Sequence, residues 1–432
     1  MNKKEASSRT THSLTARSAF LLAAAFLLPA QAQTWQTVNA FQYVDGSRSL
    51  VGDIGTDAFG HLYAVGSGAL DPNDTQRVGV VNFSDDAGET WTTLSALVDP
   101  DLPVSHHRAF AADAFGRLFV GGNARSADGS VIGWLVRESL DGGVNWTEAD
   151  ERFPFQAAYG STYAGCADVK VHPWGDVYAS GSSRNIGWVV RKRAQGQSAF
   201  TTLSFPAIAP NNQSAWGLAF DPDGSSGGYG SVIVVGDPND RWTVARSGDR
   251  GATWSIVDTL SGRDWGWSAA MGVLVTRPNA AGKRCLVVCG PAYNAKSNTY
   301  NWVVRFSADG GKSWTLSENF QYATARAWNI GGITEDAAGN IYVSGTWQDT
   351  AGRQHLMVRR SGPPTTQRGK QGRNWVEVTS LSWSTSDLFQ WEGRNTGAGD
   401  ITADAVGNVF VLGRGLDAQG KDVWLVRKLA VQ

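Results

Sequence analysis

Three arginines stand at corresponding places in the chain, each nine or ten residues before an acidic residue that begins a turn. The arginines are Arg48, Arg326 and Arg394, and the acids are Asp57, Asp336 and Asp404. A guanidinium group binds a carboxylate or sulfate through two parallel hydrogen bonds, so three of them together would bind an anionic ligand. The alternative, which we favour, is that each arginine pairs with a nearby carboxylate such as Asp53 or Asp400 and joins neighbouring parts of the fold.

Further aromatic, basic and acidic side chains fall in segments that precede short apolar runs. The ones we select as candidate ligand-binding residues, beside the three arginines, are Arg108, Arg263, Trp265, Trp328 and Glu392. Flat aromatic faces combined with directional polar groups are typical of sugar and peptide sites. Only Asp264 and Glu392 offer a pair of carboxylates that could flank a glycosidic bond, as most glycosidases require. The pattern favours binding over catalysis, and we assign no catalytic residue.

The sequence gives little indication of a metal site. His106 and His107 are adjacent, so on a strand their side chains face opposite ways, and no further His or Cys set accompanies them. The stretches 71–74 and 237–240 both read Asp-Pro-Asn-Asp and offer oxygen ligands of the kind that Ca²⁺ takes. Since Asn, Asp and Pro are also ordinary turn residues, we expect turns at both places. We predict no metal site and no cofactor.

The candidate residues recur because the sequence itself repeats. Seven units each contain an apolar run that ends in glycine, and these glycines are Gly66, Gly121, Gly181, Gly236, Gly290, Gly345 and Gly413. Their spacings are 55, 60, 55, 54, 55 and 68 residues, and the last contains a polar insert at 362–373. Each unit holds four apolar runs of strand length, which in the sixth unit are 330–334, 340–344, 356–360 and 375–378. This repeat predicts an all-β fold, a seven-bladed β-propeller of four-stranded antiparallel blades.

A second motif connects the third and fourth runs in four of the units. It begins at Ser84, Ser139, Ser247 and Ser307 and reads Ser-x-Asp-x-Gly-x-Thr-Trp, with Asn or Ser replacing Thr in two copies. The pattern resembles the Asp box, or BNR repeat, of sialidases and several other propeller families. Asp can accept hydrogen bonds from its own turn while Gly takes the positive φ, so we interpret Asp86, Asp141, Asp249 and Asp309 as structural. The resemblance also implies that these turns lie on the face away from an active site.

The sequence resembles the sialidase-like superfamily but lacks the Arg-Ile-Pro motif of the enzymes. A sialidase has an N-terminal Arg-Ile-Pro motif, a Tyr/Glu nucleophile pair, an acidic general acid and three arginines. Arg-Ile-Pro is absent here, and Arg152-Phe-Pro154 does not match it. Because fold does not fix function, two hypotheses stay open. One is a non-catalytic propeller that binds a glycan or protein ligand at the channel mouth, and the other is a sialidase-like glycoside hydrolase acting on an acidic sugar. A third, resemblance to Asp-box propellers that help assemble photosynthetic complexes, rests on fold alone.

The two ends of the chain complement one another. The seventh unit supplies only three strand-length runs before the chain ends, whereas residues 33–38 match residues 89–94, the fourth run of the first unit. We therefore expect residues 33–38 to complete the last blade and close the ring, which leaves no long unpaired edge.

The N-terminus carries an export signal. Lys3, Lys4, Arg9 and Arg17 precede the apolar run 19–28, and Ala30-Gln31-Ala32 forms an A-x-A site. We predict a signal peptide over 1–32, a propeller over 33–432, and a secreted or periplasmic protein that is a monomer and has no membrane span. Removal of residues 1–32 takes away a net charge of +3 and changes the chain's −1 to −4, which argues against a nucleic-acid partner.

The three cysteines do not suggest a disulfide framework. An odd count cannot pair fully within one chain. Cys285 and Cys289 lie four residues apart in a predicted strand, about 13 Å in such a strand, which is too far for a disulfide between them. We expect Cys166, Cys285 and Cys289 to be buried free thiols.

Overall fold

The computed structural model describes residues 34–74, 76–98, 102–126, 130–150, 164–183, 187–205, 214–224, 228–279, 282–321, 326–371 and 374–431, without the side chains of 326–329 and 368–378. Within these ranges the protein is all-β, and its only helices are two single turns, η1 (Pro238–Asp240) and η2 (Trp391–Gly393). The predicted signal peptide over 1–32 lies outside the described residues. No helix in the described ranges is long and apolar enough to cross a membrane.

Five sheets of four or five strands stand apart from one another. The first in the chain has the order β10 (Ala164–Val171), β11 (Val177–Ser183), β12 (Gly187–Arg193), β13 (Thr201–Leu203). The second is β14 (Ala215–Asp221), β15 (Ser231–Gly236), β16 (Thr243–Ser247), β17 (Ser255–Thr259). The third contains β18 (Trp265–Ser268), β19 (Gly272–Val275), β20 (Leu286–Asn294), β21 (Thr299–Ser307) and β22 (Thr315–Phe320). The fourth is β23 (Arg326–Glu335), β24 (Ile341–Gln348), β25 (Gln354–Ser361), β28 (Trp383–Phe389). The fifth is β29 (Gly397–Ala403), β30 (Val409–Leu416), β31 (Asp422–Leu429), β1 (Trp35–Phe41).

The remaining strands depart from the predicted set of seven four-stranded blades. Eight strands form one sheet, namely β2 (Ser49–Thr56), β3 (Leu62–Ala69), β4 (Arg77–Ser84), β5 (Thr92–Leu97), β6 (Val104–Ala112), β7 (Leu118–Arg125), β8 (Ile132–Ser139) and β9 (Thr147–Asp150). Its two halves are joined by a single parallel pair, Arg77 with Val104. Five separate blade-like sheets are therefore found where seven were expected, because this pair merges two groups of four strands.

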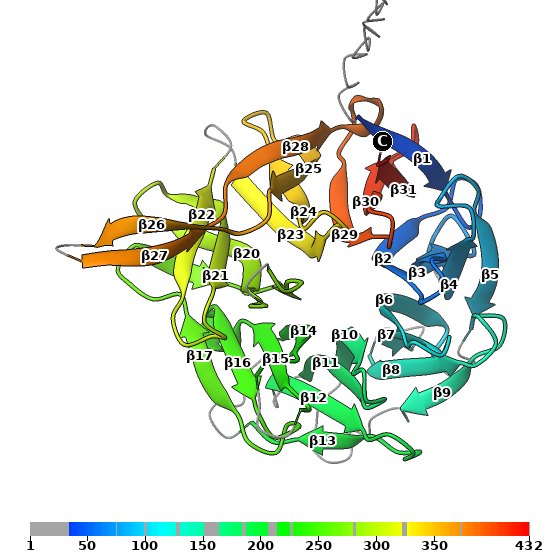
Figure 1. Ribbon diagram of the computed structural model, residues 1–432. Coiled ribbons are helices and arrows are strands. Elements are labelled where there is room, and N and C mark those ends of the chain that lie inside the picture. Colours follow the sequence, from blue (N-terminus) through cyan, green and yellow to red (C-terminus); the bar gives the residue numbers. More distant parts are fainter. Residues whose placement is uncertain are drawn as a thin grey trace, which may run out of the picture. The chain divides into compact units, whose positions relative to one another are not determined.

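One strand of the sixth unit was assigned wrongly from the sequence. Residues 375–378, expected as its fourth strand, belong to β27 (Asn374–Ser380), which pairs only with β26 (Thr365–Gln371). The strand that pairs with β25 is β28, which begins at Trp383. The polar insert and the run that follows it fold back on each other as a local hairpin, which projects from the sheets in Figure 1.

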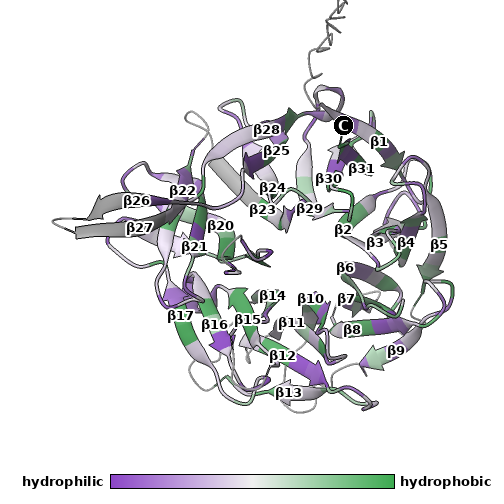
Figure 2. Cartoon of the chain, in the orientation of Figure 1, coloured by the Kyte–Doolittle hydropathy of each residue, from purple (hydrophilic) through white to green (hydrophobic). Residues whose placement is uncertain are grey.

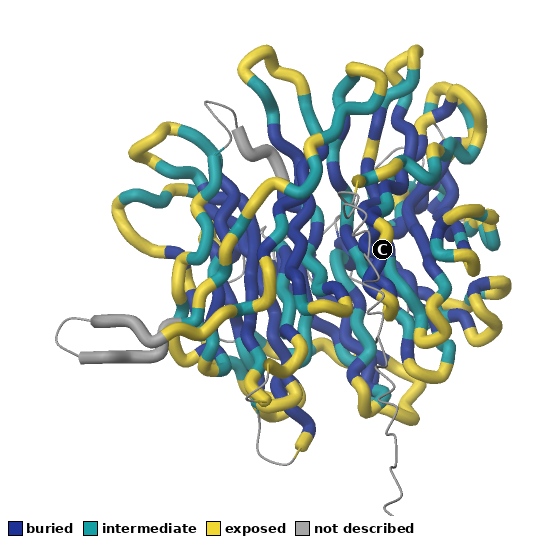
Figure 3. Tube along the Cα trace, turned by 45° about the horizontal axis from the view of Figure 1, so that its top comes forward, coloured by how far each residue is buried: buried dark blue, intermediate teal, exposed yellow. Residues whose placement is uncertain are grey.

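The sheets are arranged around a central channel lined by β2, β6, β10, β14, β19, β23 and β29 (Figure 1). Hydrophobic stretches concentrate on strands such as β15 and β20 (Figure 2). Figure 3 shows the strands buried along their length and the turns exposed at both ends. We call the end of the channel where the innermost strands begin the top mouth. The face where those strands end is the bottom face.

Each hydrophobic cluster is shared between neighbouring groups of strands. In one cluster Ile54 and Val80 pack with Leu412 and Trp424, which come from opposite ends of the chain. The repeated glycines lie at these contacts: a Cβ at Gly66 would lie 2.5 Å from Trp424 Cζ2, and one at Gly236 would lie 2.5 Å from Trp188 Cζ2. A Cβ would also lie 2.2 Å from the Leu50 carbonyl oxygen at Gly66 and 2.2 Å from the Ser214 carbonyl oxygen at Gly236. Glycine fits at these positions because backbone of the same group and a side chain of the neighbouring group both lie against it.

Buried ion pairs also link neighbouring sheets. Asp150 binds Arg191 with Oδ2 2.5 Å from Nε, and Asp258 binds Arg305 with Oδ1 2.6 Å from Nη2. Asp387 binds Arg427 in the same manner, with 2.6 Å between Oδ2 and Nε. In each pair the acid lies at or just before the end of an outer strand, and the arginine lies on the third strand of the next group. Such pairs fix how adjacent sheets face each other.

The N-terminal and C-terminal strands lie side by side. β1 pairs antiparallel with β31, from Trp35 opposite Leu429 to Phe41 opposite Trp424. Arg427 Nη1 donates to Thr37 Oγ1 at 3.0 Å. The first described strand is thus the outer strand of the sheet that contains the last three.

The cysteines follow the sequence prediction. Cys166, Cys285 and Cys289 are free and buried.

Candidate functional site

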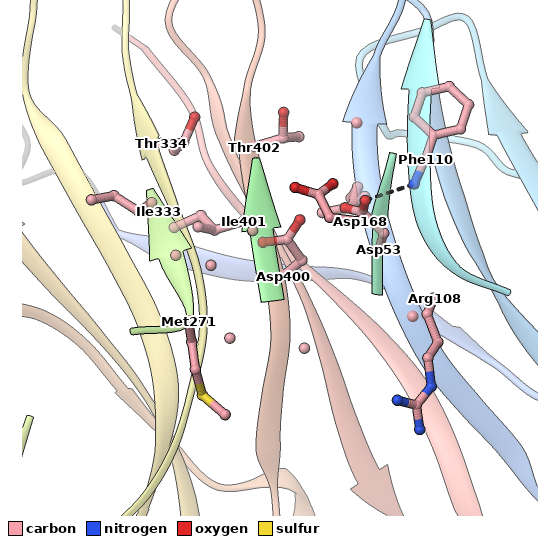
Figure 4. A pocket seen from close by; sticks show the side chains of 18 of the residues that line it. Asp53, Arg108, Phe110, Asp168, Met271, Ile333, Thr334, Asp400, Ile401 and Thr402 are labelled. Atoms are coloured by element: carbon pink, nitrogen blue, oxygen red, sulfur yellow. Dashed lines mark hydrogen bonds between the residues drawn. The ribbon is translucent and has the colours of Figure 1, made fainter. Parts of the chain in front are cut away.

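The central channel forms a cavity of about 1000 Å³. Residues of all seven innermost strands line it, from His106 and Trp216 at the top mouth to Thr334 and Thr402 near the bottom face. Figure 4 shows Arg108 and Met271 toward one end, Thr334 and Thr402 toward the other, and three aspartates between them. Pockets of this size, polar in places and apolar in others, commonly hold ligands.

Three aspartates occupy equivalent positions in the middle of the channel. In each of the three groups of strands, the residue that follows Asp53, Asp168 or Asp400 pairs with the equivalent position of the second strand. Asp53 accepts a hydrogen bond from the Phe110 N–H at 2.7 Å. Asp168 accepts one from the Leu218 N–H at 2.8 Å. These two carboxylates connect one innermost strand to the next, and Figure 4 shows all three side chains converging.

Asp400 reaches a neighbouring strand at a glycine. A Cβ at Gly332 would lie 1.5 Å from Asp400 Oδ1. Only glycine at position 332 leaves room for the Asp400 carboxyl group. The position of this carboxyl group in the channel therefore depends on a glycine in the neighbouring strand, β23.

The charges of the three aspartates and of Lys170 affect one another's protonation. Burial raises the pKa of Asp400 well above its ordinary value, and the charge of Asp53 and a hydrogen bond with it raise it further. Burial also raises the pKa of Asp168, although Lys170 Nζ, 3.3 Å from its Oδ1, acts in the opposite direction. Burial opposes the charge of Lys170, but Asp168, Asp53 and Asp400 together raise its pKa. This favours the protonated form of Asp400, hydrogen-bonded to Asp53, and an ion pair between Lys170 and Asp168.

The top mouth has a different character. Arg108 is exposed, lines the cavity, and has no hydrogen-bond or ion-pair partner within the part of the chain that the structure describes. A ring nitrogen of His106 lies 3.2 Å from the Val51 carbonyl oxygen. Burial, followed by the charge of Arg108, lowers the pKa of His106, so this imidazole is neutral near pH 7. Arg108 is therefore a cation at the mouth with its donors available.

Trp216 places an aromatic surface at the same mouth. Its indole Nε1 donates to Asp237 Oδ1 at 2.9 Å, and the Ser214 N–H donates to the same oxygen at 3.2 Å. Asp237 is only 2% exposed. Burial raises its pKa to about 6, although the hydrogen bonds from Ser214 and Trp216 oppose this shift. Asp237 thus holds Trp216 in place through a carboxylate that titrates in a mildly acidic range.

Two of the three predicted anion-site arginines are ion-paired. Arg48 Nε lies 2.8 Å from Asp422 Oδ2, and Arg394 pairs with Glu392. Neither lines the cavity. The Arg326 side chain lies outside the described residues. The partners differ from Asp53 and Asp400, which the sequence suggested. Asp422 also binds Arg414 at 2.7 Å, and Arg414 does line the cavity.

Of the other candidates whose side chains are described, Arg108 alone lines the cavity. Arg263 is exposed in the loop before β18, and Trp265 begins that strand. Asp264 pairs with Lys296 at 2.7 Å, and Glu392 is exposed in η2. The Trp328 side chain lies outside the described residues. Asp264 and Glu392 therefore do not meet in the channel as a pair of acids.

The channel aspartates were missed as a site because the sequence suggested Asp53 and Asp400 only as partners for arginine. The sequence nevertheless contains a pattern that could have identified these three aspartates. Asp53, Asp168 and Asp400 are each followed by Ile or Val and stand four residues before the first residue of the turn, which is Asp57, His172 or Asp404.

The four Ser-x-Asp turns share one hydrogen-bond pattern. In the first, Asp86 accepts from the N–H and the hydroxyl group of Thr90 at 2.9 and 2.6 Å, and Trp91 Nε1 donates to the Gly88 carbonyl oxygen. Hydrogen bonds from Thr90 lower the pKa of Asp86 to about 2. Corresponding backbone and side-chain bonds form around Asp141, Asp249 and Asp309, from Asn145, Thr253 and Ser313. Their carboxylates are occupied within the turns.

The two Asp-Pro-Asn-Asp stretches also use their first acid internally. Asp71 accepts from the Asn73 N–H at 2.8 Å, and Asp237 holds Ser214 and Trp216. In the described part of the chain, no group of three or more His, Cys, Asp or Glu residues is arranged to hold a metal ion.

Comparisons with known proteins agree on the fold. No family model and no curated protein matches the chain. Among solved structures it is similar to a GH74 xyloglucanase from Xanthomonas campestris, with a TM-score of 0.52 and 16% identity over 91% of this chain and 55% of that one. A protein of unknown function from Dyadobacter fermentans has a TM-score of 0.50 and 11% identity over 92% and 99%. A Hadza microbial sialidase has a TM-score of 0.46 and 13% identity over 69% and 63%.

The chain spans about half the length of the GH74 enzymes that it matches. At these identities the similarity shows the fold alone. The chain is a β-propeller.

Proposed function

We propose that this protein is an exported, non-catalytic propeller that binds a glycan carrying an anionic group at the top mouth of its channel. The observation that carries the proposal is Arg108, a cation at the mouth without a partner among the described residues, on the same rim as the aromatic surface of Trp216. An aromatic face packs against a sugar ring, and a guanidinium group binds a carboxylate or sulfate. The similarity to a xyloglucanase, whose name denotes a polysaccharide substrate, is compatible with a sugar ligand.

The channel carboxylates favour binding over hydrolysis. Asp53 and Asp400 interact through a hydrogen bond, whereas the two carboxyl groups of a glycosidase lie about 5 Å apart or more. Asp168 is engaged by the Leu218 N–H and by Lys170. The alternative, a sialidase-like hydrolase acting on an acidic sugar, would have to use an acid that is already occupied in this way.

We also infer that the ring has seven blades and is closed by β1. The single pair between Arg77 and Val104 is too small a link to make the eight-stranded sheet one blade, and its two halves each hold four strands. Seven innermost strands line the channel. The β1–β31 pairing and the contact of Trp424 with Gly66 support closure between the seventh and first blades.

Export remains a prediction from residues 1–32. N-terminal sequencing of the protein recovered from the periplasm or the culture medium tests it, and the expected first residue is Gln33.

The binding proposal is tested on a glycan array that carries sialosides, uronic-acid oligosaccharides, sulfated oligosaccharides and their neutral counterparts. We expect retention of acidic glycans by the wild-type chain and a loss of about tenfold in Arg108→Ala, the range for a charge-assisted hydrogen bond. Arg263→Ala is the matched control, because Arg263 is exposed but does not line the cavity. Equal retention by both variants would reject Arg108 as the ligand contact.

Incubation of the same glycans with the protein tests the alternative. Release of monosaccharide that disappears in Asp400→Asn would favour the hydrolase. Binding without any product favours the proposal.

A further inference from the structure

Arg414 is a second cation on the wall of the cavity, in addition to Arg108. It lies near the end of β30, opposite Gly397, the first residue of β29, and so belongs to the top mouth. Its side chain is 44% exposed and lines the cavity. Its Nε lies 2.7 Å from Asp422 Oδ1, and within the described ranges neither Nη atom has a partner. A guanidinium group held through Nε alone keeps both Nη groups as donors for a ligand.

Asp422 fixes Arg414 from within the protein. The Asp422 side chain is only 3% exposed, and its other oxygen, Oδ2, lies 2.8 Å from Arg48 Nε. Burial raises the pKa of Asp422, whereas the charges of Arg414, Arg48 and Arg77 oppose this shift. Because the buried carboxylate restricts the Arg414 side chain, less conformational entropy is lost when a ligand binds to its guanidinium group.

Arginines outnumber acids in this part of the rim. Asp422 lies between Arg48 and Arg414. Asp74 pairs with Arg77, and its Oδ2 lies 3.7 Å from Arg48 Nη1. Three arginines therefore face two aspartates, which leaves one positive charge in excess among these described residues. Of the three arginines, only Arg414 lines the cavity, so a ligand would meet this charge there.

Arg108 provides a separate positive charge on the same rim. It lies on β6, whereas Arg414 lies on β30, and β2 packs between β6 and β29. Burial lowers the pKa of His106, and the charges of Arg108 and Arg77 lower it further, so both arginines lie near this imidazole. The guanidinium groups of Arg108 and Arg414 thus approach the mouth from opposite sides of β2.

We propose that Arg414 is a second anion contact at the top mouth, and that the glycan bound there carries at least two carboxylate or sulfate groups. The inference rests on the proposed function, because Arg108 is taken to bind the first of these groups. Each guanidinium group offers a pair of donors that matches a carboxylate or a sulfate. A glycan with a single acidic group would leave one of the two cations unpaired. The ligand class is therefore a polyanionic glycan, such as an oligouronate or a multiply sulfated oligosaccharide.

The experiment compares glycans that share a backbone and differ in charge. The probes are trigalacturonate and its dimethyl ester, which keeps one carboxylate, together with the disulfated and monosulfated forms of one disaccharide. In calorimetric titrations of the full-length chain, we expect the multiply charged member of at least one pair to bind about tenfold more tightly, the value of a charge-assisted hydrogen bond. Its binding should also weaken more steeply with added salt.

Arg414→Gln should abolish this preference and leave the binding of the singly charged member unchanged. Arg48→Gln is the matched control: Arg48 also pairs with Asp422 and its side chain is similarly exposed, at 47%, but it does not line the cavity. Thermal melts of both variants show whether the loss of one ion pair at Asp422 disturbs the fold. Arg414→Lys, which keeps the charge but not the paired donors, should retain part of the preference.

The outcomes separate this inference from the proposed function. If Arg108→Ala weakens the binding of every acidic probe while Arg414→Gln keeps the wild-type preference, the second contact is rejected and the first stands. If the wild type binds no acidic probe, both are rejected. Equal changes of affinity in Arg414→Gln and Arg48→Gln would assign Arg414 to the fold alone. Loss of the singly charged glycan in Arg414→Gln would mean that the two arginines share one anion, and the inference of a polyanionic ligand would be wrong.

Discussion

Asp237 shows how one buried carboxylate can prepare a binding surface. Its Oδ1 accepts from the Trp216 indole and from the Ser214 N–H, so the position of the aromatic ring at the top mouth is set from within the protein. Asp240 is a further acidic residue nearby, and its charge raises the pKa of Asp237. Because Asp237 acts on a ligand only through Trp216, it is a positioning residue.

The pKa of Asp237 predicts a pH-dependent stability. Burial raises it from 3.8 to about 6. For an acid whose folded-state pKa is raised, the contribution to stability is complete below the ordinary pKa and is lost as pH rises through about 6. The loss amounts to about 3 kcal/mol.

Asp237→Asn keeps an oxygen that can accept both hydrogen bonds but does not titrate. We expect the melting temperature of this variant, relative to wild type, to rise between pH 4 and pH 7. Thermal melts across this range measure the difference, and a constant offset would show that Asp237 does not titrate in the folded protein as described.

At the scale of elements, neighbouring sheets are joined by ion pairs between an outer strand and the third strand of the next group. Asp258 illustrates the pattern, because its two oxygens lie 2.7 and 2.6 Å from Arg305 Nε and Nη2. Its Oδ2 also accepts from Trp242 Nε1 at 3.2 Å. A carboxylate buried in this way satisfies two neighbours at once, so its removal leaves an arginine and an indole without acceptors.

This arrangement predicts a large difference between two aspartates. Asp258→Ala should lower the free energy of unfolding by about 3–5 kcal/mol, because it leaves a buried charge unpaired. Asp264→Ala is the control: Asp264 also pairs with a cation at 2.7 Å, but the pair is largely exposed, and its loss should cost about 0–1 kcal/mol. Urea denaturation of both variants measures the two effects. Similar costs would mean that the buried pair adds no more than a surface pair.

At the scale of the whole molecule, the repeat made the propeller predictable and left the site obscure. The glycine-ended runs indicated the strands because strand length and turn chemistry are local properties. The reason for glycine at Gly236 was not accessible, since the Ser214 carbonyl oxygen and the Trp188 side chain that lie against it come from other strands, and Trp188 belongs to the preceding unit.

The same limit explains why only part of the candidate site could be predicted from the sequence. Arg108 was found because it is a basic residue in a segment that the sequence assigned to the entry of an innermost strand, and it lies within β6. The cluster of Asp53, Asp168 and Asp400 forms only when strands from distant parts of the sequence meet at the channel. The strand at 375–378 was misplaced because a local hairpin competed with β28 for the same role, and periodicity does not distinguish them.

The pairing of the two chain ends gives the last prediction. Arg427 is 5% exposed and donates to Thr37 Oγ1 as well as to Asp387. Trp35 Nε1 donates to Ser386 Oγ at 3.0 Å, which ties β1 to β28 in addition to β31. A chain that starts at Asn39 loses these contacts and exposes the part of the β31 edge that pairs with residues 35–37, whereas a chain that starts at Gln33 keeps them. We therefore expect the chain from Asn39 to melt several degrees below the chain from Gln33, because an unpaired edge leaves backbone donors and acceptors unsatisfied and uncovers apolar surface. Differential scanning calorimetry of the two chains, with the full-length protein as reference, measures this. Equal melting temperatures would show that β1 is an appendage, and the proposed closure of the ring would then rest on the packing of Trp424 and Phe410 alone.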